Sequence, residues 1–103
     1  MEFTWDEKKN QLNIKKHGFD FADASQVFDN IIISSLDNSQ DYGEDRWIGI
    51  GILQNGVVVV IVFTEEDGDI IRIISMRKAN KYEKAKYEKE IKDRLGSHQG
   101  DEG

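Results

Sequence analysis

The sequence predicts an α+β fold, in which a small antiparallel sheet, a meander, is combined with two N-terminal helices and one C-terminal helix. Ile and Val together number 19 and Leu four, which favours strands because β-branched side chains suit a pleated sheet. Asn55-Gly56 and Asp67-Gly68 are turn signals between apolar runs. Polar segments with helical caps flank this region. A chain of 103 residues suits one domain, which we place at residues 1–95.

The two N-terminal helices are predicted from their caps. Thr4 and Glu7 have the spacing of a capping box, so a helix should begin there and run to about Lys16, with Gly18 ending it. Asp20 can cap a second, short helix that docks on the core. The apolar residues on one face of this second helix are Phe21, Ala24, Val27 and Phe28.

The first strands follow these helices. Ile31–Ile33 opens one strand, and residues 37–45 form the longest loop. The next strand, residues 46–52, alternates isoleucines on one face with Gly49 and Gly51 on the other. The glycines leave that second face open for close packing or for a ligand.

The meander is completed by a central strand at residues 57–63 and a last strand at 70–77. Strict alternation along the last strand puts Arg72 and Arg77 on opposite faces of the sheet. Arg72, inside an apolar strand, most simply pairs with a carboxylate from the acidic middle of the chain. Arg77, at the strand end, suits a ligand equally well.

A C-terminal helix should begin at Asn80, an N-cap with Glu83 three residues on, and end near Leu95-Gly96. The thin apolar stripe of this helix consists of Tyr87, Ile91 and Leu95. Such a helix covers the sheet lightly or waits for a partner. Residues 96–103 are polar and Gly-rich, and we expect a flexible tail there.

The net charge of −6 is unevenly distributed along the chain. Residues 1–17 carry four lysines against three acids, and residues 72–94 carry nine bases against four acids. Residues 18–71 carry eleven acids against Arg46 alone. A fold that joins the two ends would make a positive surface on an acidic body, as nucleic-acid binding needs.

Several classes of function and location are disfavoured by the sequence. The chain has no cysteine, which excludes disulfides and thiolate metal sites. It has no apolar signal segment and no run long enough to span a bilayer, so we expect a cytoplasmic protein without a membrane role. Metal-ligand clusters, Ser/His/Asp sets and Gly-rich phosphate loops are missing, and no metal or cofactor is predicted.

Each candidate functional residue also has a structural interpretation. Lys16 and His17 can simply be favourable cations at a helix C-terminus, or a phosphate-binding ammonium beside a titrating imidazole. Glu83 is more often a capping residue. Tyr87 is more often part of the core, although its hydroxyl could donate a proton.

An ordered set of motifs spans positions 3 to 87. The first reads Phe3-x-Trp5-Asp6-x-x-Lys9-x-x-x-Asn13-x-x-Lys16-His17-Gly18-x-x-Phe21-x-x-Ala24. The others are Gly43-Glu44-x-Arg46, Thr64-Glu65 and Arg72-Ile73-Ile74-Ser75-x-Arg77-x-Ala79-x-x-x-Glu83-x-x-x-Tyr87. Together they resemble the signature of the BrnT family of bacterial toxins.

The resemblance implies a RelE-like fold and an endoribonuclease that halts translation. It also implies a cognate BrnA-type antitoxin with a ribbon-helix-helix DNA-binding domain, so that this chain would touch DNA only through its partner. On this reading the catalytic residues are His17, Arg46, Arg77 and Tyr87, and the RNA-binding residues are Lys9, Lys16, Lys78 and Lys81.

The chemistry of these residues suits RNA cleavage without a metal. Arg46 and Arg77 can stabilise phosphorane charge, because guanidinium presents fixed donors to phosphate oxygens. His17 and Tyr87 are candidates for proton transfer, with the acid and base roles left open. Two other classes remain: a non-catalytic protein-interaction module, and a toxin of the same fold that acts by binding a protein target.

Overall fold

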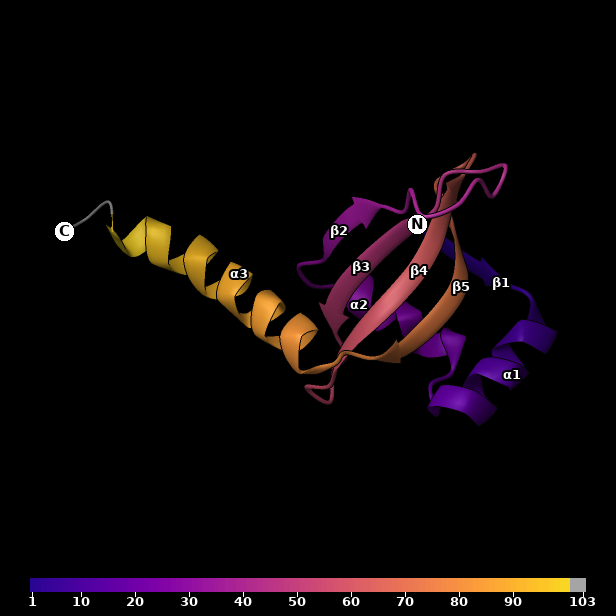
Figure 1. Cartoon of the computed structure of the whole chain (residues 1–103), viewed down its shortest axis with the longest axis horizontal. Helices are drawn as coiled ribbons and strands as arrows, with labels where there is room; N and C mark the ends of the chain where they lie inside the picture. Colours follow the sequence, from indigo (N-terminus) through magenta and orange to yellow (C-terminus); the bar gives the residue numbers. More distant parts are fainter. Residues whose placement is uncertain (101–103) are drawn as a thin grey trace.

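A computed structural model describes residues 1–100, with side chains described for residues 1–96. Five strands form one sheet in the order β1-β5-β4-β3-β2. In chain order the elements are β1 (Glu2–Trp5), α1 (Glu7–His17), the 3-10 turn η1 (Phe21–Asp23), α2 (Ala24–Phe28), β2 (Ile33–Leu36), β3 (Trp47–Ile52), β4 (Val58–Glu66), β5 (Ile70–Lys78) and α3 (Lys81–Gly100). Helix α2 lies behind the sheet, and α3 projects away from the body (Figure 1).

The predicted α+β class and the meander are confirmed. Strands β3, β4 and β5 pair antiparallel, with Ile50 opposite Val60 and Ile61 opposite Met76. The predicted helix ends are also confirmed: α1 ends at Gly18, which has a φ of 80°, and Asp20 caps η1. Strand β2 begins at Ile33, two residues later than predicted.

The predicted helix start at Thr4 is wrong. Residues 2–5 form strand β1, which pairs parallel with β5 and makes the sheet mixed rather than purely antiparallel. The N-cap of α1 is Asp6, whose side chain accepts a hydrogen bond from the Lys9 N–H at 3.1 Å. Phe3 and Trp5 pack on the core from this strand, but alternation over four residues is too short to distinguish a strand from a helix start.

Helix α1 covers the edge of β5 beyond the end of β1. The pairing of β1 ends at Trp5, opposite Ile73, so the backbone of Met76 has no partner strand on that side. The Asn13 side chain takes that place: its Nδ2 donates to the Met76 carbonyl at 2.9 Å and its Oδ1 accepts from the Met76 N–H at 3.2 Å. Asn13 therefore acts as a single residue of strand at the edge of the sheet.

One turn earlier on α1, Asn10 fixes the segment that follows the helix. Its Oδ1 accepts from the Phe21 N–H at 2.8 Å, and its Nδ2 donates to Asp20 at 3.0 Å. Both asparagines are buried. These bonds place η1 and α2 against one face of the sheet.

Each face of the sheet has its own core. On the α2 face, Phe21 and Val27 pack on Ile61 and Ile73. Gly51 is opposite Val27, and an added Cβ would overlap that side chain, so the predicted open face is used for close packing. On the other face, which α3 partly covers, the cluster consists of Ile50, Val58, Val60, Ala79 and Tyr87.

A β-bulge in β5 overturns the prediction that Arg72 and Arg77 lie on opposite faces. Val62 pairs with Ser75 and Phe63 pairs with Ile73, so Ile74 is an extra residue. Beyond the bulge the alternation is shifted by one. Arg72 and Arg77 both lie on the α3 face, paired with Thr64 and Val60.

Helix α3 is longer than predicted. It continues to Gly100, past the expected end at Leu95-Gly96. Helix therefore occupies residues 96–100 of the expected flexible tail, and residues 101–103 lie outside the described part of the chain. The apolar stripe changes along the helix, because Tyr87 is 5% exposed and Leu95 is 63% exposed.

Asn13→Ala should lower the free energy of unfolding by about 2–4 kcal/mol, because it leaves two backbone groups of Met76 without their partner. Urea unfolding measures this change. Gln11→Ala is the matched control on the same helix, because Gln11 is exposed and bonds only to Glu7 among the described residues. A loss for Asn13→Ala no larger than that of the control would contradict the role given to Asn13.

Candidate functional site

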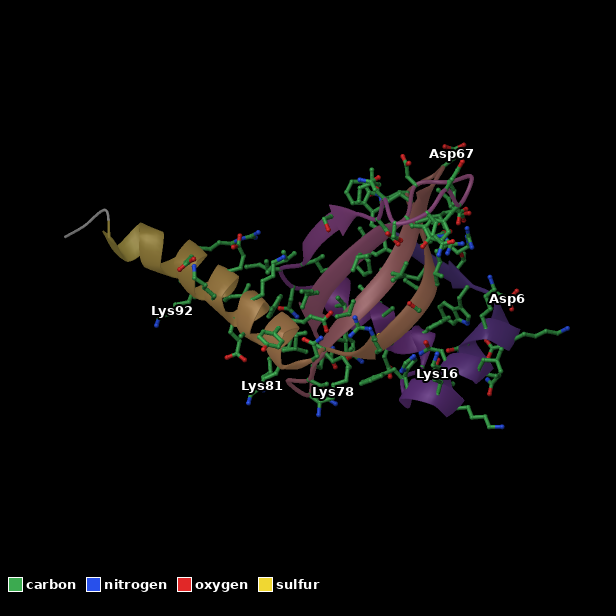
Figure 2. All side chains as sticks on the ribbon, viewed as in Figure 1. Asp6, Lys16, Asp67, Lys78, Lys81 and Lys92 are labelled. Atoms are coloured by element: carbon green, nitrogen blue, oxygen red, sulfur yellow. The ribbon has the colours of Figure 1, made fainter. Side chains whose placement is uncertain are left out.

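Basic side chains from the two ends of the chain meet along one side of the molecule, as the charge pattern predicts. They come from the end of α1, the C-terminal half of β5 and the start of α3. Figure 2 shows Lys16, Lys78 and Lys81 along this side, while Asp67 lies at the opposite end of the sheet. We call this surface the basic edge; its residues are Lys9, Lys16, His17, Arg77, Lys78 and Lys81.

His17, the last residue of α1, lines a small hollow at the basic edge. The hollow has a volume of about 220 Å³ and is bounded by α1 and by Ile74 and Ser75 of the bulge. Lys9 and Lys16 line it too. It therefore brings an imidazole, two ammonium groups and a hydroxyl to one place, held by the contact between α1 and the edge of β5.

Arg77 is held by a two-pronged ion pair with Glu83. Its Nη1 and Nη2 each donate to one carboxylate oxygen of Glu83 at 2.8 Å. Glu83 also accepts from the Asn80 N–H at 2.8 Å, and the Asn80 side chain accepts from the Glu83 N–H at 2.8 Å, which confirms the predicted capping box. The Arg77 hydrogen bonds, helped by that of Asn80, lower the pKa of Glu83 to about 2. The guanidinium is thus oriented while its side chain stays 41% exposed.

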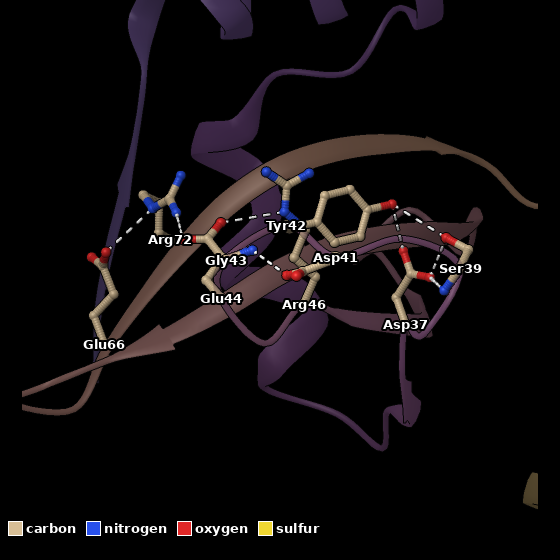
Figure 3. A network of polar contacts seen from close by, with 9 residues as sticks. All are labelled: Asp37, Ser39, Asp41, Tyr42, Gly43, Glu44, Arg46, Glu66 and Arg72. Atoms are coloured by element: carbon tan, nitrogen blue, oxygen red, sulfur yellow. Dashed lines mark hydrogen bonds and ion pairs between the residues drawn. The ribbon is translucent and has the colours of Figure 1, made fainter.

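Arg46 lies in a different cluster, at the acidic end of the same sheet face (Figure 3). Glu44 bridges two arginines: it accepts from Arg72 Nη2 at 2.6 Å and from Arg46 Nε at 3.2 Å. Arg72 Nε also donates to Glu66 at 3.3 Å, which confirms the predicted carboxylate pairing of Arg72. The Arg46 guanidinium lies 4.0 Å from the centre of the Tyr42 ring. The Arg72 hydrogen bond lowers the pKa of the Glu44 carboxyl.

The two arginine clusters are well separated. Arg77 is level with Val60 on β4, and Arg46 precedes Trp47, which is level with Phe63. Four residues of strand correspond to about 13 Å. The structure therefore does not bring Arg46 together with His17 and Arg77.

Tyr87 points from α3 into the core cluster on this face of the sheet, away from the basic edge. Its hydroxyl donates to the Ile31 carbonyl at 2.8 Å, and burial raises its pKa. This position matches the core interpretation of Tyr87. The phenol fastens α3 to the segment that leads into β2.

Sequence reasoning missed two features of the site. The bulge that places Ser75 beside His17 leaves no mark in the sequence of β5, because Ile74 is no different in type from the isoleucines around it. Asn13 belonged to the motif but had no role assigned. The sequence signal that could have revealed this role is a pair of asparagines, Asn10 and Asn13, three residues apart in a helix. Asparagine is unfavourable inside a helix unless its side chain forms hydrogen bonds outside the helix.

The described residues hold neither a metal-binding cluster nor a membrane-spanning helix. No three His, Asp or Glu side chains in that part of the chain are grouped as a metal ion would require. No helix in it is long and apolar enough to cross a membrane.

The fold is that of a class of small bacterial ribonuclease toxins. A family model described as the ribonuclease toxin BrnT of type II toxin–antitoxin systems matches residues 5–83. The crystal structure of the Brucella abortus ribonuclease toxin BrnT is similar, with a TM-score of 0.60 and 30% identity over 79% of this chain and 99% of that one. No curated protein matches. The chain belongs to the BrnT family of ribonuclease toxins.

The Arg77–Glu83 pair should make stability depend on pH. Because the pKa of Glu83, about 2, lies below its ordinary value of 4.5, the pair stabilises the fold above about pH 4.5 and is lost as the pH falls toward 2. Glu83→Gln keeps the capping box and removes the charge. It should cost about 1 kcal/mol at pH 7, a value reduced by solvent around the exposed guanidinium, and almost nothing at about pH 2.

Urea unfolding of the parent and of Glu83→Gln at several pH values measures this difference. The control is Glu65→Gln, at an exposed position near the end of β4. A Glu83→Gln effect that is the same at both ends of the pH range would show that the charge of Glu83 contributes nothing.

Proposed function

We propose that this toxin is a metal-independent endoribonuclease that halts translation by cleaving RNA at the basic edge. The observation that carries the proposal is the hollow that His17 and Ser75 line together with Lys9 and Lys16. Arg77 follows two residues after Ser75 on the same face of β5. The RNA backbone would lie across the end of α1 and the bulge of β5. Lys9, Lys16, Lys78 and Lys81 would hold its phosphates.

Cleavage without a metal makes three demands on the site. The 2′-hydroxyl must lose a proton, the phosphorane must be stabilised, and the leaving 5′-oxygen must gain a proton. In this proposal His17 moves a proton and Arg77 stabilises the phosphorane. The proposal does not use Arg46 at the scissile phosphate, because it lies about 13 Å along the strands from Arg77. It does not use Tyr87 there either, because the Tyr87 hydroxyl is bonded to Ile31.

Glu83 has a direct bearing on the proposed chemistry. It occupies both terminal nitrogens of Arg77, and the guanidinium has five N–H donors in total. Because Arg77 Nη1 also donates to the Lys78 carbonyl at 3.3 Å, a phosphate oxygen would approach the remaining donors on Nε and Nη2 while Glu83 holds the plane of the group. This fits a preorganised donor, which gains its advantage by needing no reorientation during the reaction.

Neutralisation by a BrnA-type ribbon-helix-helix antitoxin completes the proposal, with DNA contacted only through that partner. Residues 37–45 carry four acids and no base. A basic antitoxin segment would complement this loop and the acidic body around it. The complex would form in the cytoplasm, where the RNA substrate also lies.

The decisive experiment incubates the purified chain with a defined RNA, with and without EDTA, and sequences the new ends. Cleavage that persists in EDTA supports the proposal, and cleavage that EDTA abolishes overturns its metal independence. No cleavage in either arm would favour the two other classes, a toxin directed at a protein or an interaction module.

Arg77→Ala should lower the cleavage rate by about 10²–10³, because it removes one preorganised charge donor. It should also abolish growth inhibition. Since the substitution leaves Glu83 unpaired, the same change is made in a Glu83→Gln background, where no buried charge is left without a partner. Equal toxicity of the double variant and Glu83→Gln at equal expression would show that Arg77 is not needed.

Arg72→Ala is the matched control for Arg77. It removes an arginine from the same strand and the same face, but from the acidic cluster with Glu44 and Glu66. We expect a lower melting temperature with the cleavage rate of the folded protein nearly unchanged.

The cleavage rate should change with pH between about 5.5 and 8 if an imidazole moves the proton. His17→Gln should lower the rate and remove that pH dependence. Single-turnover cleavage of a short RNA measures both. A parent profile that is flat over this range, or full activity of His17→Gln, would return His17 to the role of a helix-end cation.

A further inference from the structure

Helix α3 extends beyond what the body of the protein supports. Its 20 residues correspond to about 30 Å, and the matched family model ends at residue 83, near its start. Tyr87 and Ile91 contact the sheet cluster, whereas Leu95 is 63% exposed. A helix segment of this length is marginal in water without packing. Among the described side chains of the outer half of α3, Leu95 therefore lacks the packing that would stabilise this part of the helix.

An apolar hollow lies beside this helix, at the end of the β3–β4 hairpin. Its volume is about 520 Å³. The sheet side is formed by Ile52, Gly56 and Val58, and the α3 side by Tyr87, Ile91 and Leu95 with the charged residues Lys84, Glu88 and Lys92. The hollow runs along α3 from Lys84 to Gly96, so that Tyr87 lies at its inner end and the exposed Leu95 at its outer end.

We propose that the hollow is filled by α3 of a second copy of this chain, the two helices running antiparallel about a two-fold axis. Ile91, Leu95, Lys84, Glu88 and Lys92 fall within an arc of about 100° on the helix, so one surface presents them all. A two-fold interface requires a patch that is complementary to itself. This surface has that property.

The complementarity follows from the spacing of the residues. We place the two-fold axis at the level of Glu90. A residue that lies a given number of positions before Glu90 in one copy is then level with the residue the same number of positions after Glu90 in the other copy. Glu88 of each copy is then level with Lys92 of the other, which makes two reciprocal ion pairs. Leu95 of the second copy reaches the level of residue 85, where it enters the hollow next to Tyr87.

The apolar side chains interleave in the same arrangement. Along the helix pair, successive apolar side chains come alternately from the two copies. From one end to the other they are Leu95 of the second copy, Tyr87 of the first, Ile91 of the second, Ile91 of the first, Tyr87 of the second and Leu95 of the first. Gly96, which lines the hollow, is opposite Lys84 and leaves room for its long side chain. The two-fold contact thus buries the exposed tip of each helix against the root of the other.

Sedimentation of the full chain over a range of concentrations tests the proposal. We expect a species of twice 11.9 kDa that dissociates on dilution. Leu95→Asp should raise the dimer dissociation constant by about tenfold or more. Tyr82→Asp is the matched control, because Tyr82 is 87% exposed on the opposite side of the same helix, and it should leave dimerisation unchanged.

A charge exchange distinguishes this interface from any other dimer. Glu88→Lys and Lys92→Glu should each weaken the dimer, and the double variant should restore it, because the pair forms across the two copies. The chain has no cysteine, so Ile91→Cys can be oxidised and should give a disulfide-linked dimer. Circular dichroism checks that each variant is folded.

A chain that stays monomeric at every concentration overturns the proposal. That is the result expected if the hollow receives a helix of the antitoxin instead of a second copy. The proposal is also overturned if Leu95→Asp leaves the dimer dissociation constant unchanged, or if the double variant of Glu88 and Lys92 does not restore dimerisation. Each of these results leaves the ribonuclease proposal untouched, because RNA cleavage is measured separately.

Discussion

The edge of β5 is the constraint on which this structure depends. Strand β1 is too short to cover it, and the buried backbone of Met76 would otherwise have no hydrogen-bond partner. Asn13 supplies both the donor and the acceptor, so α1 has one position along the strand. That position sets where His17 and Lys16 lie relative to β5. The basic edge therefore rests on a backbone hydrogen-bonding requirement rather than on attraction between its own groups, which repel one another.

Charge separation is the second organising feature. Acids from the loop before β3 and from the end of β4 gather at one end of the sheet, where Glu44 and Glu66 bind Arg46 and Arg72. At the other end the acidic partner of Arg77 among the described residues is Glu83, which also caps α3. Arg46 and Arg72 share Glu44 and fasten the loop before β3. Arg77, whose side chain is 41% exposed, is the arginine that we propose for the phosphate.

Helix α3 connects the two proposals. Its first turn orients Arg77 through Glu83, and its middle is anchored by Tyr87 at the Ile31 carbonyl. The outer half, with Leu95 exposed, lies beyond the residues matched by the family model. A contact that steadies the outer half of the helix would also steady the capping box at its root, because the two are parts of one rigid element.

By itself the sequence determined the elements that depend on local chemistry. The caps at Gly18 and Asn80, the turns of the meander and the separation of charge all follow from residue type and spacing, and the family follows from motifs in order. Tertiary structure alone decided β1, the bulge at Ile74 and the placement of Arg46 away from His17. Four residues of β1 have no preference strong enough to predict a strand without the edge they pair with. A one-residue bulge changes which face an arginine occupies without changing the composition of the strand.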